Sequence, residues 1–183
     1  MGQNGLFQYY VEGECEKNLL RSLMHAKDAD YLIRPGKIER LNPVTERIST
    51  VKAMTIKKGT KVALVFDTDG SSVGILEENV KTLKQIAGLE EKDILFLMSV
   101  KCFEDELVFS CDSIRDVKTL IKLFGSQGLN AFKADFCKCR NLEEKLKQLG
   151  FDLQRMWTRT ADKPFHRFTN SGKAIKISHK GQK

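Results

Sequence analysis

The sequence predicts an α/β fold in which a mostly parallel sheet is flanked by helices on both faces. Short apolar runs alternate along the chain with segments whose apolar residues recur every three or four positions, the pattern of strand–helix–strand units. Two of these runs, residues 62–66 and 93–100, are continuously apolar, as expected for parallel strands buried on both faces. The length of 183 residues suits one domain with a substantial core.

The first half of the chain contains the clearest alternation. Residues 5–11 are rich in aromatic and β-branched residues, so they predict a strand, which ends at a Glu-Gly pair. Residues 14–25 place large apolar side chains on one helical face and predict a helix. A second short strand is expected over residues 31–34, because a Pro-Gly pair follows it. The pattern of residues 37–60 is ambiguous.

The second half continues the alternation less regularly. A helix is predicted over residues 73–87, between the two apolar strands, because its apolar residues form one stripe and a glycine follows. Two further helices are predicted over residues 113–124 and 141–149, and each is also followed by a glycine. Residues 130–138 give no clear prediction, and a last strand is expected over residues 174–177.

The composition is typical of a soluble globular protein that resides in the cytoplasm. Hydrophobic residues make up 41% of the chain and charged residues 30%. The sequence contains no run of about 18 apolar residues, so no membrane span is expected. The first residues lack the features of a signal peptide. The five cysteines are an odd number and are expected to be reduced.

The net charge of +7 is concentrated at the end of the chain. Residues 154–183 contain eight Lys and Arg but only one Asp, so the first 153 residues are neutral overall. We therefore expect a main domain over residues 1–153 and a basic segment over residues 154–183 that packs on it. Such a segment suits a nucleic-acid partner, although a solvated basic tail remains an alternative. The expected phosphate contacts are Arg155, Arg159, Lys163, Arg167, Lys173 and Lys176.

Acidic residues follow two of the predicted strands. Asp67 and Asp69 come directly after the strand over residues 62–66, and Glu12 follows the first strand, with Glu16 one helical turn further on. If these strands are neighbours, about 5 Å apart, the four carboxylates converge. Hard oxygen ligands of this kind suit Mg²⁺ or Mn²⁺. Alternatively, the Asp pair only forms a turn, and the Glu pair stabilises the following helix by interacting with its dipole.

These residues carry a resemblance to a known family. Val11-Glu12-Gly13, followed later by an apolar strand and Asp67-Thr68-Asp69-Gly70, resembles the Toprim family of primases, topoisomerases and small nucleases. Within it, the E-G-x-x-E spacing of residues 12–16 is similar to the OLD-type and RloB-like proteins of bacterial anti-phage defence. Cys102-Phe103-Glu104 is also similar to a segment of the RloB-like proteins. The resemblance covers roughly residues 6–110.

The resemblance implies a Rossmann-like Toprim sheet and a nuclease that cleaves phosphodiester bonds of DNA or RNA by a two-metal mechanism. It implies that the metal ligands are Glu12, Glu16, Asp67, Asp69 and Glu104, the last of which is equally well explained as part of a solvated acidic turn. OLD-type enzymes also use a C-terminal lysine, for which Lys163 is the first candidate and Lys173 the second. The chain lacks the G-x-x-x-x-G-K-[ST] motif, so an effector subunit of this kind would need a separate ATPase partner.

Two other functions remain open at this point. The stretch around Asp67 also resembles the first motif of haloacid-dehalogenase phosphatases, in which Asp67 would be the nucleophile, and residues 111–116 imitate the last acidic motif of that family. That alternative leaves Glu12 and Glu16 unexplained. The other alternative is a non-catalytic regulatory subunit that binds nucleic acid.

Overall fold

The computed structural model describes residues 6–177 and contains a four-stranded sheet in which every pairing is parallel. The strand order is β2-β1-β3-β4, so β1 and β3 are neighbours at the centre of the sheet. Together with the flanking helices, this Rossmann-like arrangement confirms the predicted α/β class. The strands are β1 (Phe7–Val11), β2 (Lys37–Arg40), β3 (Lys61–Asp67) and β4 (Ile94–Ser99).

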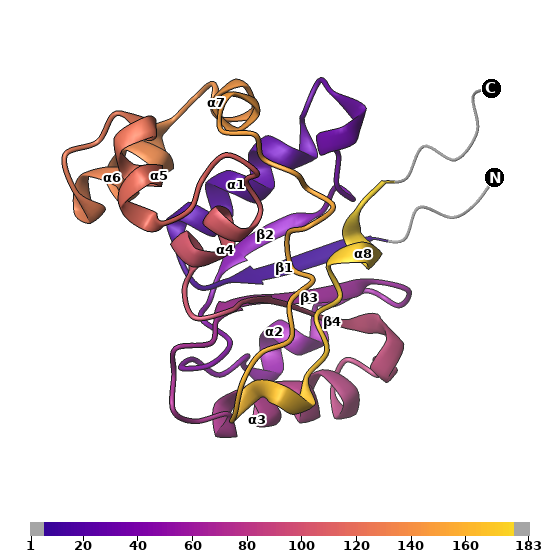
Figure 1. Cartoon of the computed structure of the whole chain (residues 1–183). Helices are drawn as coiled ribbons and strands as arrows, with labels where there is room; N and C mark the ends of the chain where they lie inside the picture. Colours follow the sequence, from indigo (N-terminus) through magenta and orange to yellow (C-terminus); the bar gives the residue numbers. More distant parts are fainter. Residues whose placement is uncertain (1–5, 178–183) are drawn as a thin grey trace.

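Helices cover both faces of the sheet (Figure 1). Helix α1 and helices α4–α7 lie on one face, and α2 and α3 lie on the other. Within residues 6–177, no helix is both long enough and apolar enough to cross a membrane. The helices are α1 (Glu14–Met24), α2 (Thr50–Met54), α3 (Gly74–Gln85), α4 (Phe103–Phe109), α5 (Val117–Phe124), α6 (Leu129–Lys138), α7 (Leu142–Gln148) and α8 (Gly172–Ile175).

Each face of the sheet buries its own apolar core. Along β1, Tyr9 and Val11 belong to the core under α1, whereas Tyr10 belongs to the core under α3. This alternation follows from the two-residue period of a strand. Residues Val62–Phe66 of β3 are completely buried on both faces. The continuous apolar runs in the sequence therefore have the predicted cause.

Two of the expected strands are wrong. Residues 31–34 do not join the sheet; Ile33 is buried and forms a single antiparallel bridge with Lys176. The second strand is instead β2, an edge strand of sequence KIER with no fully buried residue, which is why no apolar run marks it. Residues 174–177 form the end of helix α8 and that one bridge, because Gly172 to Ile175 close a helical turn first.

Residues 154–177 pack on the rest of the protein and cover the free edge of β4. The Asn170 side chain accepts a hydrogen bond from Met98 N at 2.7 Å and donates one to Met98 O at 3.0 Å. Trp157 and Phe165 are fully buried, Trp157 in the core under α1 and Phe165 in the core under α3. This segment descends from α7 past β4 and then returns to α8 (Figure 1). It protects an edge that would otherwise expose unpaired backbone groups.

Candidate active site

The strand order creates a topological switch point between β1 and β3. The chain leaves β1 toward β2 on one side and leaves β3 toward β4 on the other, and α1 and α3 accordingly lie on opposite faces. In open parallel sheets, ligands bind outside the carboxyl ends of the strands at such a point. Glu12 follows β1 and Asp67 ends β3, so both acids stand at this position.

Glu12 and Asp67 are joined directly. The Glu12 backbone N–H donates to Val65 O at 3.1 Å, which extends the pairing of β1 with β3 by one residue. The Asp67 backbone N–H donates to the Glu12 carboxylate Oε2 at 2.9 Å. The two strand ends are therefore neighbours, and the expectation that their acids converge is met for this pair.

Glu16 completes the contribution of α1 to this site. It lies in the first turn of the helix and is 5% exposed. A Cβ atom on Gly13 would lie 2.9 Å from the Glu16 carboxylate Oε2. The backbone of Gly13 is extended, so the glycine is needed for the space it leaves rather than for its conformational freedom.

A cavity of about 300 Å³ lies in front of these acids. Five carboxylates from three segments line it: Glu12, Glu14 and Glu16 from the first, Asp67 from the second and Glu104 from the third. Glu14 is exposed and pairs with Lys17, so the other four form the acidic cluster. Glu104 belongs to α4, which begins four residues after β4, and is 2% exposed. It is therefore part of the acidic cavity and not of a solvated turn.

Burial and mutual repulsion raise the pKa values of three of these carboxyls. Burial, then the charges of Glu16 and Glu12, raise the pKa of Asp67 to about 8. Burial, together with the charges of Glu12 and Glu104, raises the pKa of Glu16 to about 7. The pKa of Glu12 is raised mainly by burial. Desolvation and like charge both disfavour ionised carboxylates.

The donor set fits a divalent cation. Asp67 Oδ1 is buried and makes no hydrogen bond to any described residue. Such an oxygen, in a cavity also lined by Glu12, Glu16 and Glu104, is what a hard cation such as Mg²⁺ or Mn²⁺ binds. Among residues 6–177, no three Asp, Glu, His or Cys side chains already close around one point. The long Glu side chains would therefore have to rotate toward Asp67 to complete a coordination shell.

Asp69 lies outside the cavity. It is exposed in the turn after β3 and does not line the cavity, but its charge contributes to the raised pKa of Glu12. Asp69 therefore stands at the rim, where it reaches the other acids through its electrostatic field.

Lys133 is a cavity residue that the sequence did not reveal. Its Nζ lies 3.3 Å from Glu104 Oε1, and it lines the same cavity as the carboxylates. Burial lowers the pKa of Lys133, but the negative charges of Glu104 and Asp67 outweigh this and raise it overall. Its helix, α6, is tied to α1 because the Asn18 side chain donates to Phe136 O at 2.7 Å. No local motif marks this lysine.

The two C-terminal lysines predicted for catalysis do not reach the cavity. Lys163 and Lys173 are exposed, and neither lines it. Lys163 precedes Phe165, whose ring packs against Phe66 of β3 with centroids 5.7 Å apart. Lys173 lines a separate cavity beside Leu95 and Trp157.

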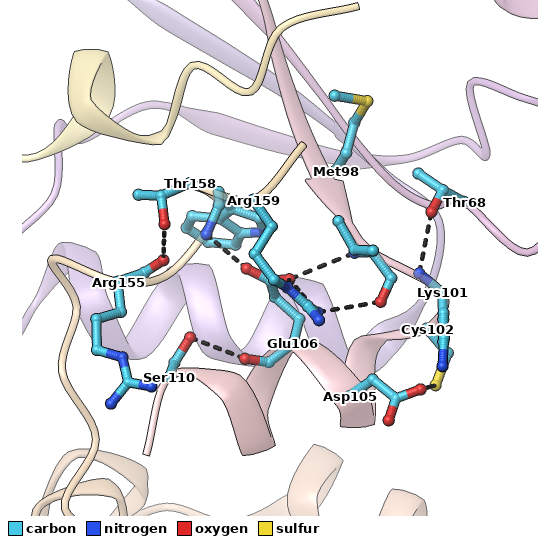
Figure 2. A network of polar contacts seen from close by, with 12 residues as sticks. Thr68, Met98, Lys101, Cys102, Asp105, Glu106, Ser110, Arg155, Thr158 and Arg159 are labelled. Atoms are coloured by element: carbon cyan, nitrogen blue, oxygen red, sulfur yellow. Dashed lines mark hydrogen bonds and ion pairs between the residues drawn. The ribbon is translucent and has the colours of Figure 1, made fainter. Parts of the chain in front are cut away.

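Most of the predicted phosphate-binding residues form internal contacts. Arg159 pairs with the completely buried Glu106, with Nη2 2.6 Å from Oε2 (Figure 2). Lys176 is buried and donates to the carbonyls of Gln154 and Met156, and burial lowers its pKa to about 8. Arg155 pairs with Asp112, and Arg167 pairs with Glu77.

Only Lys163 and Lys173 of the six remain exposed without an acidic partner among the described residues. Lys180 and Lys183, which belong to the same basic segment, lie outside those residues.

The acidic motif expected for the phosphatase alternative lies away from the cavity. Asp112 is exposed, pairs with Arg155 and does not line the acidic cavity. Asp69, the expected acid/base of that mechanism, also lies outside it. The structure thus leaves Asp67 without the partners that this mechanism needs.

No family model, curated protein or solved structure matches this chain. The class of protein is therefore defined by its own fold and site. It is an α/β protein with a parallel sheet and a partly buried cluster of carboxylates, with one lysine, at the topological switch point.

Proposed function

We propose that the protein is a metal-dependent nuclease that hydrolyses phosphodiester bonds of DNA or RNA at the acidic cavity. The observation that carries this proposal is the convergence of Glu12, Glu16, Asp67 and Glu104 at the switch point of the sheet. Carboxylates crowded into one partly buried cavity repel each other, and a divalent cation relieves this repulsion. The Toprim resemblance implies Glu12, Glu16, Asp67 and Asp69 as metal ligands, with Glu104 as a fifth candidate. In this proposal Asp69 acts from the rim of the cavity.

The residues have distinct roles in this proposal. Asp67, whose Oδ1 has no other partner among the described residues, is the central ligand, and Glu12 and Glu16 flank it from the end of β1 and the start of α1. Glu104 joins from α4 and holds Lys133 beside the cavity. Lys133 supplies positive charge for the phosphate that undergoes cleavage. Mg²⁺ or Mn²⁺ held by these carboxylates would lower the pKa of an attacking water and stabilise the leaving oxygen.

The biological setting follows from the resemblance alone. By its resemblance to OLD-type and RloB-like proteins, the protein would act in the cytoplasm as the effector subunit of an anti-phage defence system. A separate ATPase subunit would supply the missing nucleotide-binding function. Co-purification of an ATPase with the tagged protein from its native host tests this part of the proposal.

Incubation of the protein with labelled single- and double-stranded DNA and with total RNA tests the activity. We expect cleavage with Mg²⁺ or Mn²⁺, none with EDTA, and a loss of at least about 100-fold in Asp67→Asn. Asp93→Asn is the matched control, because Asp93 immediately precedes β4 and so lies at the amino ends of the strands, away from the acidic cavity. Cleavage that persists in EDTA or in Asp67→Asn overturns the proposal.

The same preparations separate the alternatives. A covalent aspartyl-phosphate on Asp67 would establish the phosphatase. Binding of nucleic acid without any cleavage, unchanged in Glu12→Gln and accompanied by no detectable binding of Mg²⁺ in calorimetry, would establish the regulatory subunit.

A further inference from the structure

A second cavity, larger than the acidic one, lies beside it. It has a volume of about 610 Å³ and lies between α1 and the segment from the end of α6 to α7. Cys137 lines both cavities, so the two lie next to each other at this residue. We call the larger one the basic groove, because it is lined by five Lys and Arg side chains, Arg21, Lys27, Lys138, Arg140 and Lys147.

Four of these five cations have no acidic partner within residues 6–177. Arg21, Lys27, Lys138 and Arg140 are exposed, and none forms an ion pair with another described residue. Lys147 differs, because it pairs with Asp28 at 3.0 Å and with Glu143 at 2.9 Å. Its charge is therefore compensated within the protein, whereas the other four point to an external anion.

The acids of the groove do not cancel this charge. Two glutamates line it, and one of them, Glu143, is already occupied. Its carboxylate accepts the backbone N–H groups of Lys27 at 2.9 Å and Asp28 at 3.1 Å, in addition to Lys147. Glu144 is the only uncommitted acid among the lining residues, so the four free cations leave a clear positive excess.

The walls of the groove are fixed relative to each other. Asn18, which also lines it, donates to the carbonyls of Phe136 at 2.7 Å and Cys139 at 3.4 Å. These bonds join the middle of α1 to the C-terminal end of α6. The groove is therefore preformed, which lowers the entropic cost of binding a ligand.

We propose that the basic groove binds the phosphate backbone of a nucleic-acid strand and leads it into the acidic cavity. This inference rests on the proposed function for its direction, since the strand must reach the carboxylates. Free cations in a continuous groove are suited to successive phosphates. The groove is lined by no Phe, Tyr or Trp of the described chain, so base stacking contributes little and binding is independent of sequence.

Fluorescence anisotropy in EDTA measures this binding without cleavage. The probes are labelled single-stranded DNA and RNA oligonucleotides of mixed sequence, and the groove variant combines Arg21→Gln, Lys138→Gln and Arg140→Gln. The matched control combines Lys57→Gln, Lys58→Gln and Lys81→Gln. These substitutions remove the same charge on the side of the sheet covered by α2 and α3. Equal melting temperatures of the two variants would show that a loss of binding is not caused by unfolding. If the triple variant is destabilised, the three single substitutions are measured instead.

We expect the groove variant to bind at least about 10-fold more weakly than the control variant. The slope of log affinity against log salt concentration should be smaller in magnitude by about 2 to 3. Each removed cation leaves one phosphate with its counterion still bound, so fewer counterions are released on binding. Asp67→Asn should bind as well as the wild type or better, because it removes negative charge near the strand.

The proposal fails if the wild type does not bind the oligonucleotides in EDTA, or if the groove and control variants bind equally. It also fails if polyglutamate of the same charge competes as well as unlabelled oligonucleotide, because the groove then takes acidic proteins. Failure of the nuclease proposal is distinguishable. In that case the wild type does not cleave with Mg²⁺, yet the groove variant still loses binding. Conversely, if the wild type cleaves with Mg²⁺ and the groove variant binds as well as the control variant, only the proposal for the basic groove is overturned.

Discussion

Asp67 combines burial, two acidic neighbours and a carboxylate oxygen without a hydrogen bond to any described residue, so its ionisation opposes folding. Glu16 and Asp67 have pKa values of about 7 and about 8 in the folded protein, above the values of about 4.3 and 3.9 expected in an unfolded chain. Between about pH 4 and pH 8 the folded state therefore binds more protons than the unfolded state. Their contribution to stability is therefore complete below about pH 4 and is lost as the pH rises through 7 to 8.

This predicts that Asp67→Asn, which removes the charge, stabilises the metal-free protein at high pH. The melting temperature should rise by about 3–6 °C at about pH 8 and change little at about pH 4.5, measured by circular dichroism in EDTA. Addition of Mg²⁺ at about pH 8 should stabilise the wild type but not the variant. Parallel pH profiles for the two proteins would show that the carboxyl groups do not interact as described.

Gly13 gives a second prediction at the scale of one residue. A methyl group there would collide with the Glu16 carboxylate, which can move because it is the end of a flexible side chain. Gly13→Ala should therefore fold normally but bind Mn²⁺ about 10-fold more weakly in calorimetry. The control is Gly128→Ala, since a Cβ there meets no other atom within 4 Å. Equal Mn²⁺ affinity in both variants would exclude Glu16 as a ligand.

Lys133 gives a third prediction. If it stabilises the phosphate during cleavage, Lys133→Gln should lower kcat by about 100-fold while substrate affinity changes little. Lys163→Gln and Lys173→Gln, which replace the lysines favoured by the sequence, should change kcat by less than about 3-fold, because neither residue lines the cavity. A large loss of kcat in Lys163→Gln but not in Lys133→Gln would instead assign stabilisation of the phosphate to Lys163 of the C-terminal segment.

At the scale of elements, helix α4 joins the sheet to the C-terminal segment through Glu106. This carboxylate, completely buried, accepts Val100 N at 3.3 Å and Trp157 N at 2.7 Å and pairs with Arg159 (Figure 2). Trp157 has a positive φ of 56°, a strained conformation for a residue with a large side chain. The bond from its N–H to Glu106 helps to hold that conformation.

Glu106→Gln should therefore destabilise the protein by about 2–3 kcal/mol in urea unfolding, because it leaves the partly buried Arg159 charge without its partner. Arg155→Gln is the comparison, since Arg155 forms an exposed pair with Asp112 and packs on Phe109 as Arg159 does. Loss of that pair should cost less than about 1 kcal/mol. Similar losses in the two variants would contradict a structural role for the Glu106 network.

At the scale of the whole molecule, the C-terminal segment is part of the fold. Trp157, Phe165 and Ile175 complete the two cores, and Asn170 caps the edge of β4. A chain that ends at residue 153 should lose cooperative unfolding, lose its near-ultraviolet circular dichroism and bind the dye ANS. Retention of a cooperative thermal transition by this chain would show that residues 1–153 fold independently.

The sequence by itself determined the α/β class, the central strands and the positions of Glu12 and Asp67 at strand ends, whereas the order of the strands in the folded sheet made these two acids neighbours. The features that the sequence determined depend on local periodicity and on the rule that parallel strands end at one edge. The tertiary structure alone decided that Lys133 faces the carboxylates, that Glu104 lines the cavity and that Arg159 and Lys176 face inward. Each of these depends on which helix packs against which strand, and a charged side chain carries no local signal of the partner that will compensate it.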